Sequence, residues 1–326
     1  MTKGLTMQTN NESSVSTRER VGLALAGSDT VSAVDAIGKA ESAGVRQIWM
    51  TQSTPLPDTL GIFTAAAMKT SSIRMGTAIV PTYPRHPLAL AQQALTIADL
   101  APDRLRLGVG PSHRPVMEGV YGLSMESPHE HLREYVAVLR ALLWDGKVDF
   151  QGKYYTVKST FPRPPRIPIL VSALRENAFH LAGEISDGSL SWVCPPPYLL
   201  EKSLPAQRAG AAEVGRSVPP LVAHIPVAFS QDKQAVLAAT RQQLGRYGKL
   251  PFYVKMFASA GFTIPSSGEL PEDLVESLVL SGDDATIAER VRGYLDAGLD
   301  EVMLFPITIK DVSAEQVQLM RFIGQL

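Results

Sequence analysis

The sequence predicts an α/β protein, most specifically a (β/α)8 TIM barrel, from three observations. Eight apolar runs of strand length recur along the 326 residues, and segments with apolar residues at helical spacing separate nearly all of them. Such alternation indicates parallel strands joined by right-handed crossovers, and eight units suit a closed barrel, although the count leaves a doubly wound sheet open. No Gly-x-Gly-x-x-Gly motif follows the first strand, which disfavours a dinucleotide-binding sheet.

Apolar spacing and helix-terminating residues place the individual elements. Strands are expected at residues 21–26, 47–50, 75–80, 105–109, 169–171, 188–193, 221–229 and 301–305. Helices are expected at residues 31–43, 59–69, 87–98, 128–145, 177–183, 195–215, 233–247, 273–280, 285–297 and 312–323. Asp58 is placed to cap the second helix, and Gly44 and Gly298 to end theirs.

Three segments depart from the strand–helix alternation. Residues 113–127 are polar and contain glycine, which indicates a loop. Residues 148–157 predict a small hairpin that turns at Gln151 and Gly152. Residues 249–272 mix apolar residues with Gly, Pro and Ser without a clear period, and we interpret them as an insertion.

Composition excludes several classes of function. The chain is 45% hydrophobic with a formal net charge of -1, so it offers no excess charge to nucleic acid or to an anionic membrane. Cys194 is the single cysteine, and no apolar run approaches the roughly 20 residues of a membrane span. Residues 1–19 are polar and lack the apolar core of a secretory signal. We therefore expect a cytoplasmic protein with a disordered extension at residues 1–19 and a single barrel domain at residues 20–326.

The carboxyl ends of the strands carry the candidate ligand-binding residues, because parallel α/β folds bind ligands there. Tyr83 lies between prolines in the loop after the third strand, and Gly108, Gly110 and His113 end and follow the fourth. Glycines at such a position either relieve crowding or let a flat ring approach the backbone, and the spacing favours neither.

A bound cofactor is expected to carry the reaction, because the chain lacks a self-contained catalytic set. Ser172 and Arg175 follow the fifth strand, where they either hold an anion with the free N–H groups of the next helix or form an ordinary cap. His129 and His131 lie on different faces of one helix and do not chelate one metal, so no metal site is expected.

Beyond these patterns, the segment that begins GTAIVPTYPRHPLALAQQAL at residue 76 resembles the luciferase-like flavin and deazaflavin oxidoreductases. It is most similar to the branch that depends on coenzyme F420 and is related to methylene-tetrahydromethanopterin reductase. LAGEISDG at residues 181–188 and SGDDATIAERVRGYLDAGLDEV at residues 281–302 carry the same resemblance, which extends from about residue 20 to residue 305. It implies a (β/α)8 barrel, usually a homodimer, with F420 or FMN at the carboxyl ends of the strands.

The resemblance also implies roles for individual residues. In F420-dependent members a non-prolyl cis peptide, here Ala78–Ile79, lies behind the ring of the cofactor. The full expected set of cofactor-binding residues is Thr51, Gln52, Thr77, Ala78, Ile79, Gly108, Gly110, Ser172, Ala173, Leu174 and Arg175. Ser53, Tyr83, Trp192 and His224 are expected to contact the substrate, and His113 is expected to be the catalytic proton donor or acceptor.

Some positions depart from the pattern of the family. Leu174 brings bulk, and Glu176 a negative charge, to the segment that contacts the phosphate. Ser53 and His113 occupy the positions of a His and a Glu that handle protons in glucose-6-phosphate-oxidising relatives. The resemblance therefore does not imply oxidation of a sugar phosphate here.

The resemblance implies an F420-dependent oxidoreductase that transfers a hydride between C5 of the deazaflavin and an activated C=C or C=N bond of a small molecule. One alternative is an FMN-dependent two-component monooxygenase on the same barrel. A second alternative is a non-catalytic homologue without a cofactor, which the departures at Leu174 and Glu176 favour. The insertion is expected to cover the substrate or to form a dimer contact.

Overall fold

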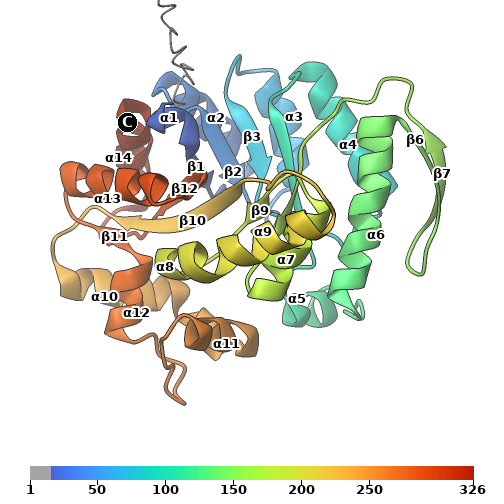
Figure 1. Cartoon of the computed structure of the whole chain (residues 1–326). Helices are drawn as coiled ribbons and strands as arrows, with labels where there is room; N and C mark the ends of the chain where they lie inside the picture. The colour runs from blue at the N-terminus through green and yellow to red at the C-terminus, as the bar shows by residue number, and fades with distance from the viewer. Residues whose placement is uncertain (1–15) are drawn as a thin grey trace, which may run out of the picture.

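The computed structural model describes residues 16–326, which form the predicted closed barrel of eight parallel strands surrounded by helices (Figure 1). The strands of the barrel are β1 (Val21–Leu25), β2 (Gln47–Met50), β3 (Arg74–Thr77), β5 (Leu105–Gly110), β8 (Ile169–Ser172), β9 (Ser189–Leu190), β10 (Leu221–Ala228) and β12 (Glu301–Pro306). Because β10 pairs with both β9 and β12, the ring is closed. Two short strands extend it, β4 (Val80–Pro81) beside β5 and β11 (Leu280–Ser281) beside β10.

Helices cover the outside of the barrel and part of its carboxyl end (Figure 1). They are α1 (Thr17–Arg20), α2 (Thr30–Ser42), α3 (Thr59–Ala67), α4 (Pro87–Leu100), α5 (Arg114–Gly119), α6 (Pro128–Arg140), α7 (Glu176–Ile185), α8 (Pro196–Tyr198), α9 (Leu204–Glu213), α10 (Lys233–Leu244), α11 (Pro251–Ser259), α12 (Glu272–Leu278), α13 (Asp284–Asp296) and α14 (Val312–Gln325). The π-helical turns η1 (Ala141–Asp145) and η2 (Leu199–Ser203), the 3-10 turn η3 (Gly245–Lys249) and the hairpin of β6 (Lys147–Gln151) and β7 (Thr156–Thr160) complete the described elements.

The predicted helix ends are confirmed. Asp58 caps α3 by accepting a hydrogen bond from the Gly61 N–H at 2.9 Å. Gly44 and Gly298 follow α2 and α13 with φ angles of 92° and 116°, a region that favours glycine. These caps fix where the chain leaves each helix and turns into the next strand.

Three local predictions were wrong, and the segment interpreted as an insertion contains a helix. The third strand is interrupted by Ala78–Ile79, and its ladder resumes at β4. The hairpin turns over residues 152–155, where the Gly152 N–H donates to the Tyr155 carbonyl at 2.8 Å, because Gln151 pairs with Thr156. The expected loop at 113–127 contains α5, and the aperiodic insertion contains α11. Each of these helices has a proline in its first turn, which suits a helix start.

Trp49 fills the barrel interior and explains two glycines. A Cβ atom added at Gly76 would lie 2.2 Å from the Trp49 ring, and one at Gly22 would lie 2.7 Å from it. Small residues on these strands therefore serve packing around the indole. Trp49 forms an inner cluster with Leu170, Leu190, Val222 and Met303.

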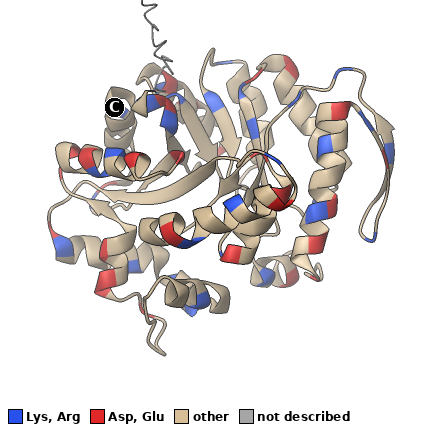
Figure 2. Ribbon diagram, in the orientation of Figure 1, with Lys and Arg blue, Asp and Glu red and all other residues tan. Residues whose placement is uncertain are grey.

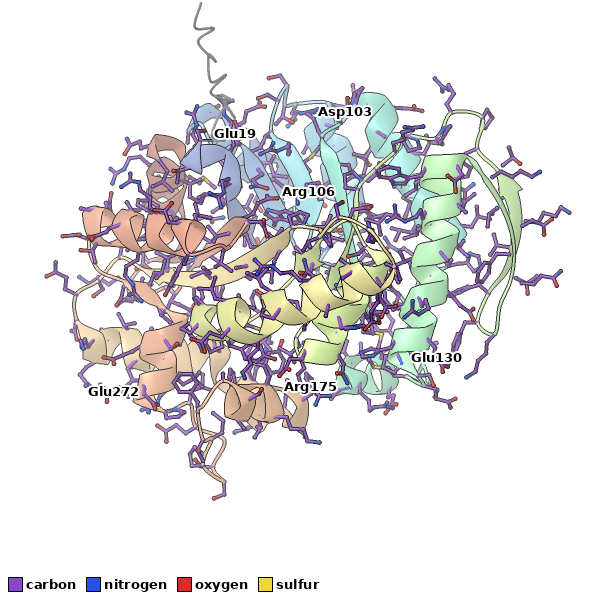
Figure 3. All side chains as sticks on the ribbon, viewed as in Figure 1. Glu19, Asp103, Arg106, Glu130, Arg175 and Glu272 are labelled. Carbon is purple, nitrogen blue, oxygen red and sulfur yellow. The ribbon has the colours of Figure 1, made fainter. Side chains whose placement is uncertain are left out.

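The amino end of the barrel is polar, and charges alternate over the outer helices (Figure 2). Arg106 of β5 donates two hydrogen bonds to Glu301 of β12, at 2.7 and 2.9 Å, and its guanidinium lies 4.8 Å from the Trp49 ring centroid. Asp103 before β5 and Arg175 after β8 mark the opposite ends of the barrel (Figure 3). The ligand-binding candidates are thus at the end away from this ion pair.

The predicted extension lies mostly outside the described residues. Of residues 1–19, Thr17–Glu19 belong to α1, and Glu19 forms ion pairs with Arg46 and Arg74, so this part of the prediction was wrong. None of the helices in residues 16–326 combines the length and the apolar composition that crossing a membrane requires.

Candidate functional site

The loop after β2 is hydrogen-bonded to the segment that interrupts β3, at the carboxyl end of the barrel. The Thr51 hydroxyl donates to the Ala78 carbonyl at 2.6 Å, and the Gln52 N–H donates to the Ile79 carbonyl at 3.2 Å. The Ala78–Ile79 peptide is cis, as the resemblance implied, and both residues pack on the inner cluster around Trp49. Four expected cofactor residues therefore lie together.

Ser172 and Gly110 adjoin this segment from β8 and β5. A Cβ atom added at Gly110 would lie 2.0 Å from Ser172 Oγ and 3.5 Å from Ile79 Cδ1. The missing side chain at Gly110 thus lets the Ser172 hydroxyl lie against the backbone of β5 beside Ile79. Six residues predicted from sequence thus lie next to one another: Thr51, Gln52, Ala78, Ile79, Gly110 and Ser172. We call this set the floor of the site.

Three other expected cofactor residues lie within the barrel wall. The buried Thr77 hydroxyl donates to the Gly108 carbonyl at 2.7 Å, and a Cβ atom at Gly108 would lie 2.0 Å from the Thr77 carbonyl oxygen. Packing between β3 and β5 accounts for this glycine. The Ala173 N–H donates to the Leu190 carbonyl at 2.9 Å, so this N–H is not available to a phosphate.

The start of α7 retains unpaired donors next to Ala173. Among the described residues, the N–H groups of Leu174 and Arg175 have no hydrogen-bond acceptor, and the Arg175 side chain is exposed. The Leu174 side chain packs against the core, which directs its bulk away from these donors. Glu176 is exposed, and its carboxylate accepts a hydrogen bond from the Ser259 hydroxyl of α11 at 3.3 Å. An anion here would meet two N–H groups and a guanidinium beside one carboxylate.

Trp192 and His224, two expected substrate residues, lie together with Phe305 of β12. The Trp192 and Phe305 rings stack, with centroids 5.1 Å apart and planes 23° apart. The His224 ring meets both edge-on, at 4.2 and 5.0 Å. His224 is 4% exposed, and its buried Nε2 has no hydrogen-bond partner among the described residues.

Ring contacts with η3 and α11 connect His113 to the group of Trp192, His224 and Phe305. Its ring stacks on Phe252 of α11 at 5.3 Å and meets the rings of Tyr253 and Tyr247 at 5.9 and 6.4 Å. Tyr247 in turn lies 6.0 Å from Trp192, which joins the two groups. We call the seven residues the rim cluster: His113, Trp192, His224, Tyr247, Phe252, Tyr253 and Phe305.

Both histidines of the rim cluster are uncharged at neutral pH. Burial, with a smaller contribution from the Arg246 guanidinium, lowers the pKa of His113. Burial lowers the pKa of His224 to about 3. A neutral imidazole can donate at one nitrogen and accept at the other, but it places no fixed charge in the site.

Tyr83 and Ser53 are placed apart from the rim cluster. Tyr83 stacks on His131 of α6 with centroids 3.9 Å apart, and its hydroxyl donates to the Glu126 carbonyl at 2.6 Å. None of the ring contacts among the described residues joins Tyr83 to Trp192 or His224. Ser53 is exposed, and its hydroxyl faces the carbonyl of the adjacent Thr54 at 3.4 Å. The structure brings Trp192 and His224 together and places Tyr83 and Ser53 outside the rim cluster, and the expected contact of these residues with the substrate stays a prediction.

The sequence analysis missed four residues of the rim cluster: Tyr247, Phe252, Tyr253 and Phe305. Aromatic residues on strands and helices usually indicate core, so their type alone gave no signal. The position of Phe305 at a strand end, and the location of Phe252 and Tyr253 in the insertion, were the available signals.

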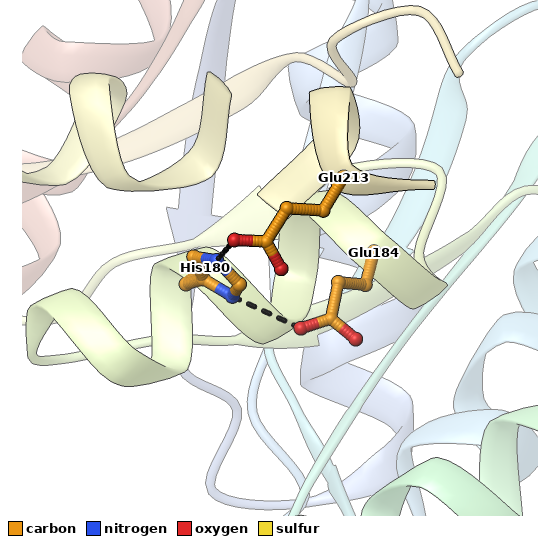
Figure 4. Close-up of side chains that lie close together, drawn as sticks. All are labelled: His180, Glu184 and Glu213. Carbon is orange, nitrogen blue, oxygen red and sulfur yellow. Dashed lines mark hydrogen bonds and ion pairs between the residues drawn. The ribbon is translucent and has the colours of Figure 1, made fainter. Parts of the chain in front are cut away.

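One further group of polar residues lies on the outer helices, away from the strand ends. His180 of α7 has Nδ1 2.9 Å from Glu184 and Nε2 3.0 Å from Glu213 of α9 (Figure 4). These three side chains could in principle surround a metal ion. However, the hydrogen bonds with Glu213 and Glu184 raise the pKa of His180, which favours an imidazolium that pairs with both carboxylates. This arrangement is an ion pair between two helices.

Comparison with known proteins places these features in a family. The sequence model described as luciferase-like monooxygenase matches residues 8–301. An uncharacterised protein of Mycobacterium tuberculosis is 30% identical over 270 residues, which cover 73% of this chain and 79% of that one. The chain is also similar to a protein of Nocardia farcinica named F420-dependent glucose-6-phosphate dehydrogenase, with 29% identity over 79% of this chain and 80% of the other.

Solved structures show the same fold. An F420-dependent secondary alcohol dehydrogenase in complex with an F420-acetone adduct has a TM-score of 0.77 and 19% identity, over 94% of this chain and 97% of the other. The oxygenating constituent of 3,6-diketocamphane monooxygenase from Pseudomonas putida, in complex with FMN, has a TM-score of 0.72 and 17% identity, over 94% and 96%. The fold thus occurs with either cofactor.

Proposed function

This chain belongs to the luciferase-like monooxygenase family, and on that premise we propose that it is an F420-dependent oxidoreductase acting on an activated C=C or C=N bond of a small molecule. One observation carries the proposal. At the strand ends, the half-buried Ala78–Ile79 segment is held by hydrogen bonds from Thr51 and Gln52 and lies beside the Ser172 hydroxyl. This arrangement suits a bound cofactor that supplies the chemistry, while the chain supplies position and polarity.

The residues at the strand ends fit such a cofactor. The floor offers a half-buried apolar surface at Ala78 and Ile79, edged by the hydroxyl groups of Thr51 and Ser172. A planar ring suits that surface, and a phosphate suits the free N–H groups that begin α7. The relative from Nocardia farcinica is named as F420-dependent, and this similarity favours F420 over FMN as the cofactor of the present chain.

When bound, reduced F420 supplies a hydride from C5. This chain would hold the substrate over the floor and against the half-buried rings of the rim cluster. His113 would relay a proton from solvent, because its neutral ring donates and accepts at different nitrogens. The helix α11, which carries Phe252 and Tyr253, would exclude water from the reacting atoms. We also propose a homodimer, the usual assembly of the family.

A titration of the purified chain with F420, reduced F420 and FMN tests the proposal. We expect saturable binding of F420, and hydride transfer without consumption of oxygen. Tight FMN binding without F420 binding would favour the two-component monooxygenase, for which the FMN complex of the same fold is the supporting observation. Failure to bind any of the three would favour a non-catalytic homologue, although the packing of Leu174 on the core removes one reason for that alternative.

A further inference from the structure

The rim cluster presents aromatic rings at the carboxyl end of the barrel that the packing leaves incompletely covered. His113, Trp192, Phe252 and Phe305 are half-buried, whereas Tyr247, Tyr253 and His224 are buried behind them. The four half-buried rings come from separate parts of the chain: the ends of β5, β9 and β12, and helix α11. Such a surface offers stacking contacts rather than hydrogen bonds.

The rings form two stacks of nearly parallel planes. Trp192 and Phe305 differ by 23° in plane, and His113 and Phe252 differ by 27°. Tyr247 lies edge-on to Trp192 and His113, at 66° and 70°, and holds the two stacks apart. A flat molecule can extend either stack by offset stacking, which aromatic rings prefer.

The polar groups nearest these rings are engaged within the chain. The guanidinium of Arg246 is bound to Tyr247, with Nη2 2.9 Å from the hydroxyl and the carbon 5.0 Å from the ring centroid. At the edge of α11, the Glu176 carboxylate accepts a hydrogen bond from Ser259. Nε2 of His224 has no partner among the described residues, but it is buried behind the half-buried rings. The half-buried ring faces are therefore the recognition surface of the cluster.

We propose that the substrate is a flat, ring-containing carbonyl or imine compound that stacks on the half-buried rings of Trp192 or Phe252, and not a phosphorylated sugar. This inference rests on the proposed function, which assigns the rim cluster to the substrate and the floor to the cofactor. It makes Phe252 and Trp192 determinants of specificity. Both are half-buried, so substitution is tolerated better than in the core.

The test is a calorimetric titration of the full chain with coumarin as the neutral probe and glucose 6-phosphate as the anionic one, with and without saturating F420. Trp192 provides a second readout, because a ring stacked on it quenches its fluorescence. We expect coumarin to bind the F420-loaded chain. In Phe252→Ala the affinity for coumarin should be about tenfold weaker. In Trp192→Phe coumarin should still bind, but the quenching signal should be lost. Phe150→Ala, on the outer hairpin, is the matched control and should bind as the unaltered chain does.

The outcomes separate this inference from the proposed function. Coumarin binding that depends on Phe252 in a chain that binds no F420 supports the ring site and overturns the cofactor assignment. F420 binding with no affinity for coumarin, or with tighter binding of glucose 6-phosphate, overturns the inference. A Phe252→Ala variant that loses F420 rather than coumarin also overturns it, because the rings would then belong to the cofactor.

Discussion

His113 is a member of the rim cluster and is also the proposed proton relay. It caps no N–H group by its side chain, and its ring contacts come from the insertion. We expect His113→Ala to lower turnover about a hundredfold, the scale of a lost general acid–base group, while the F420 dissociation constant stays within twofold. Equal losses of turnover and of cofactor binding would make His113 a structural residue.

Protonation of His113 is expected to make turnover fall as the pH is lowered. Burial lowers the pKa of His113, so its ring stays neutral to lower pH than a free histidine and becomes charged as the pH falls further. If the neutral ring is the active form, turnover stays level around neutral pH and declines on the acidic side, below the range in which a free histidine titrates. Rates at saturating F420 from neutral to acidic pH would show it, and a decline that persists in His113→Ala would assign it to another group.

Gly110 supports the floor through Ser172 rather than by direct exposure. Because an added Cβ would lie 2.0 Å from Ser172 Oγ, Gly110→Ala should displace Ser172 and weaken F420 binding. We expect the affinity for F420, measured by absorbance titration, to fall about tenfold, which corresponds to about 1.4 kcal/mol of binding free energy. Adding Ser172→Gly should restore part of the affinity, since the clash is removed.

The matched control is Gly119→Ala on α5, where an added Cβ would have no atom within 4 Å. It should bind F420 like the unaltered chain. If Ser172→Gly failed to rescue Gly110→Ala, the contact between these two residues would not be what holds the floor in place.

At the scale of elements, the start of α7 carries a carboxylate that opposes the proposed phosphate. Glu176 lies at the first helical position, next to the free N–H groups of Leu174 and Arg175. We expect Glu176→Gln to tighten F420 binding by roughly threefold at low salt, and this gain to vanish near 0.5 M salt because exposed charges are screened there. Asp284→Asn, at the start of α13, is the control and should leave the affinity unchanged. Weaker binding in Glu176→Gln would mean that its contact with Ser259 organises the site.

Sequence patterns predicted the elements that repeat and missed those that tertiary contacts decide. The barrel strands and most outer helices follow from apolar spacing, and Asp58 marked its helix start correctly. The helix α5 escaped because Met117 is its one buried residue, so its sequence shows no apolar face. The buried residues of α11, Tyr253, Met256 and Phe257, do have helical spacing, but the Gly, Pro and Ser residues that follow obscured it. Tyr83 stacks on His131, a contact that the sequence of its loop does not indicate. Only the folded chain decides which ring a loop residue meets.

At the scale of the whole molecule, the two ends of the barrel differ in chemistry. The amino end is closed by the ion pair of Arg106 and Glu301 with Gln47. The carboxyl end presents the rings of the rim cluster and the hydroxyl groups of the floor, with the exposed Arg175 and Glu176 at the start of α7. Between the two ends Trp49 fills the interior and contacts both the Arg106 guanidinium and the cluster beneath Ala78–Ile79. The buried ion pair thus lies opposite the proposed site.

This division predicts how the barrel responds to loss of its ion pair. Both side chains are largely buried, with exposures of 15% and 17%, so Glu301→Gln leaves Arg106 without a counter-charge and should cost about 2–3 kcal/mol of unfolding free energy. The double variant Arg106→Met, Glu301→Leu removes both charges and should recover at least half of that loss. Urea unfolding measures both, with the exposed pair variant Asp99→Asn as a control that should change stability by less than about 0.5 kcal/mol. A double variant less stable than Glu301→Gln would show that the pair itself, rather than an orphaned guanidinium, stabilises the closed ring.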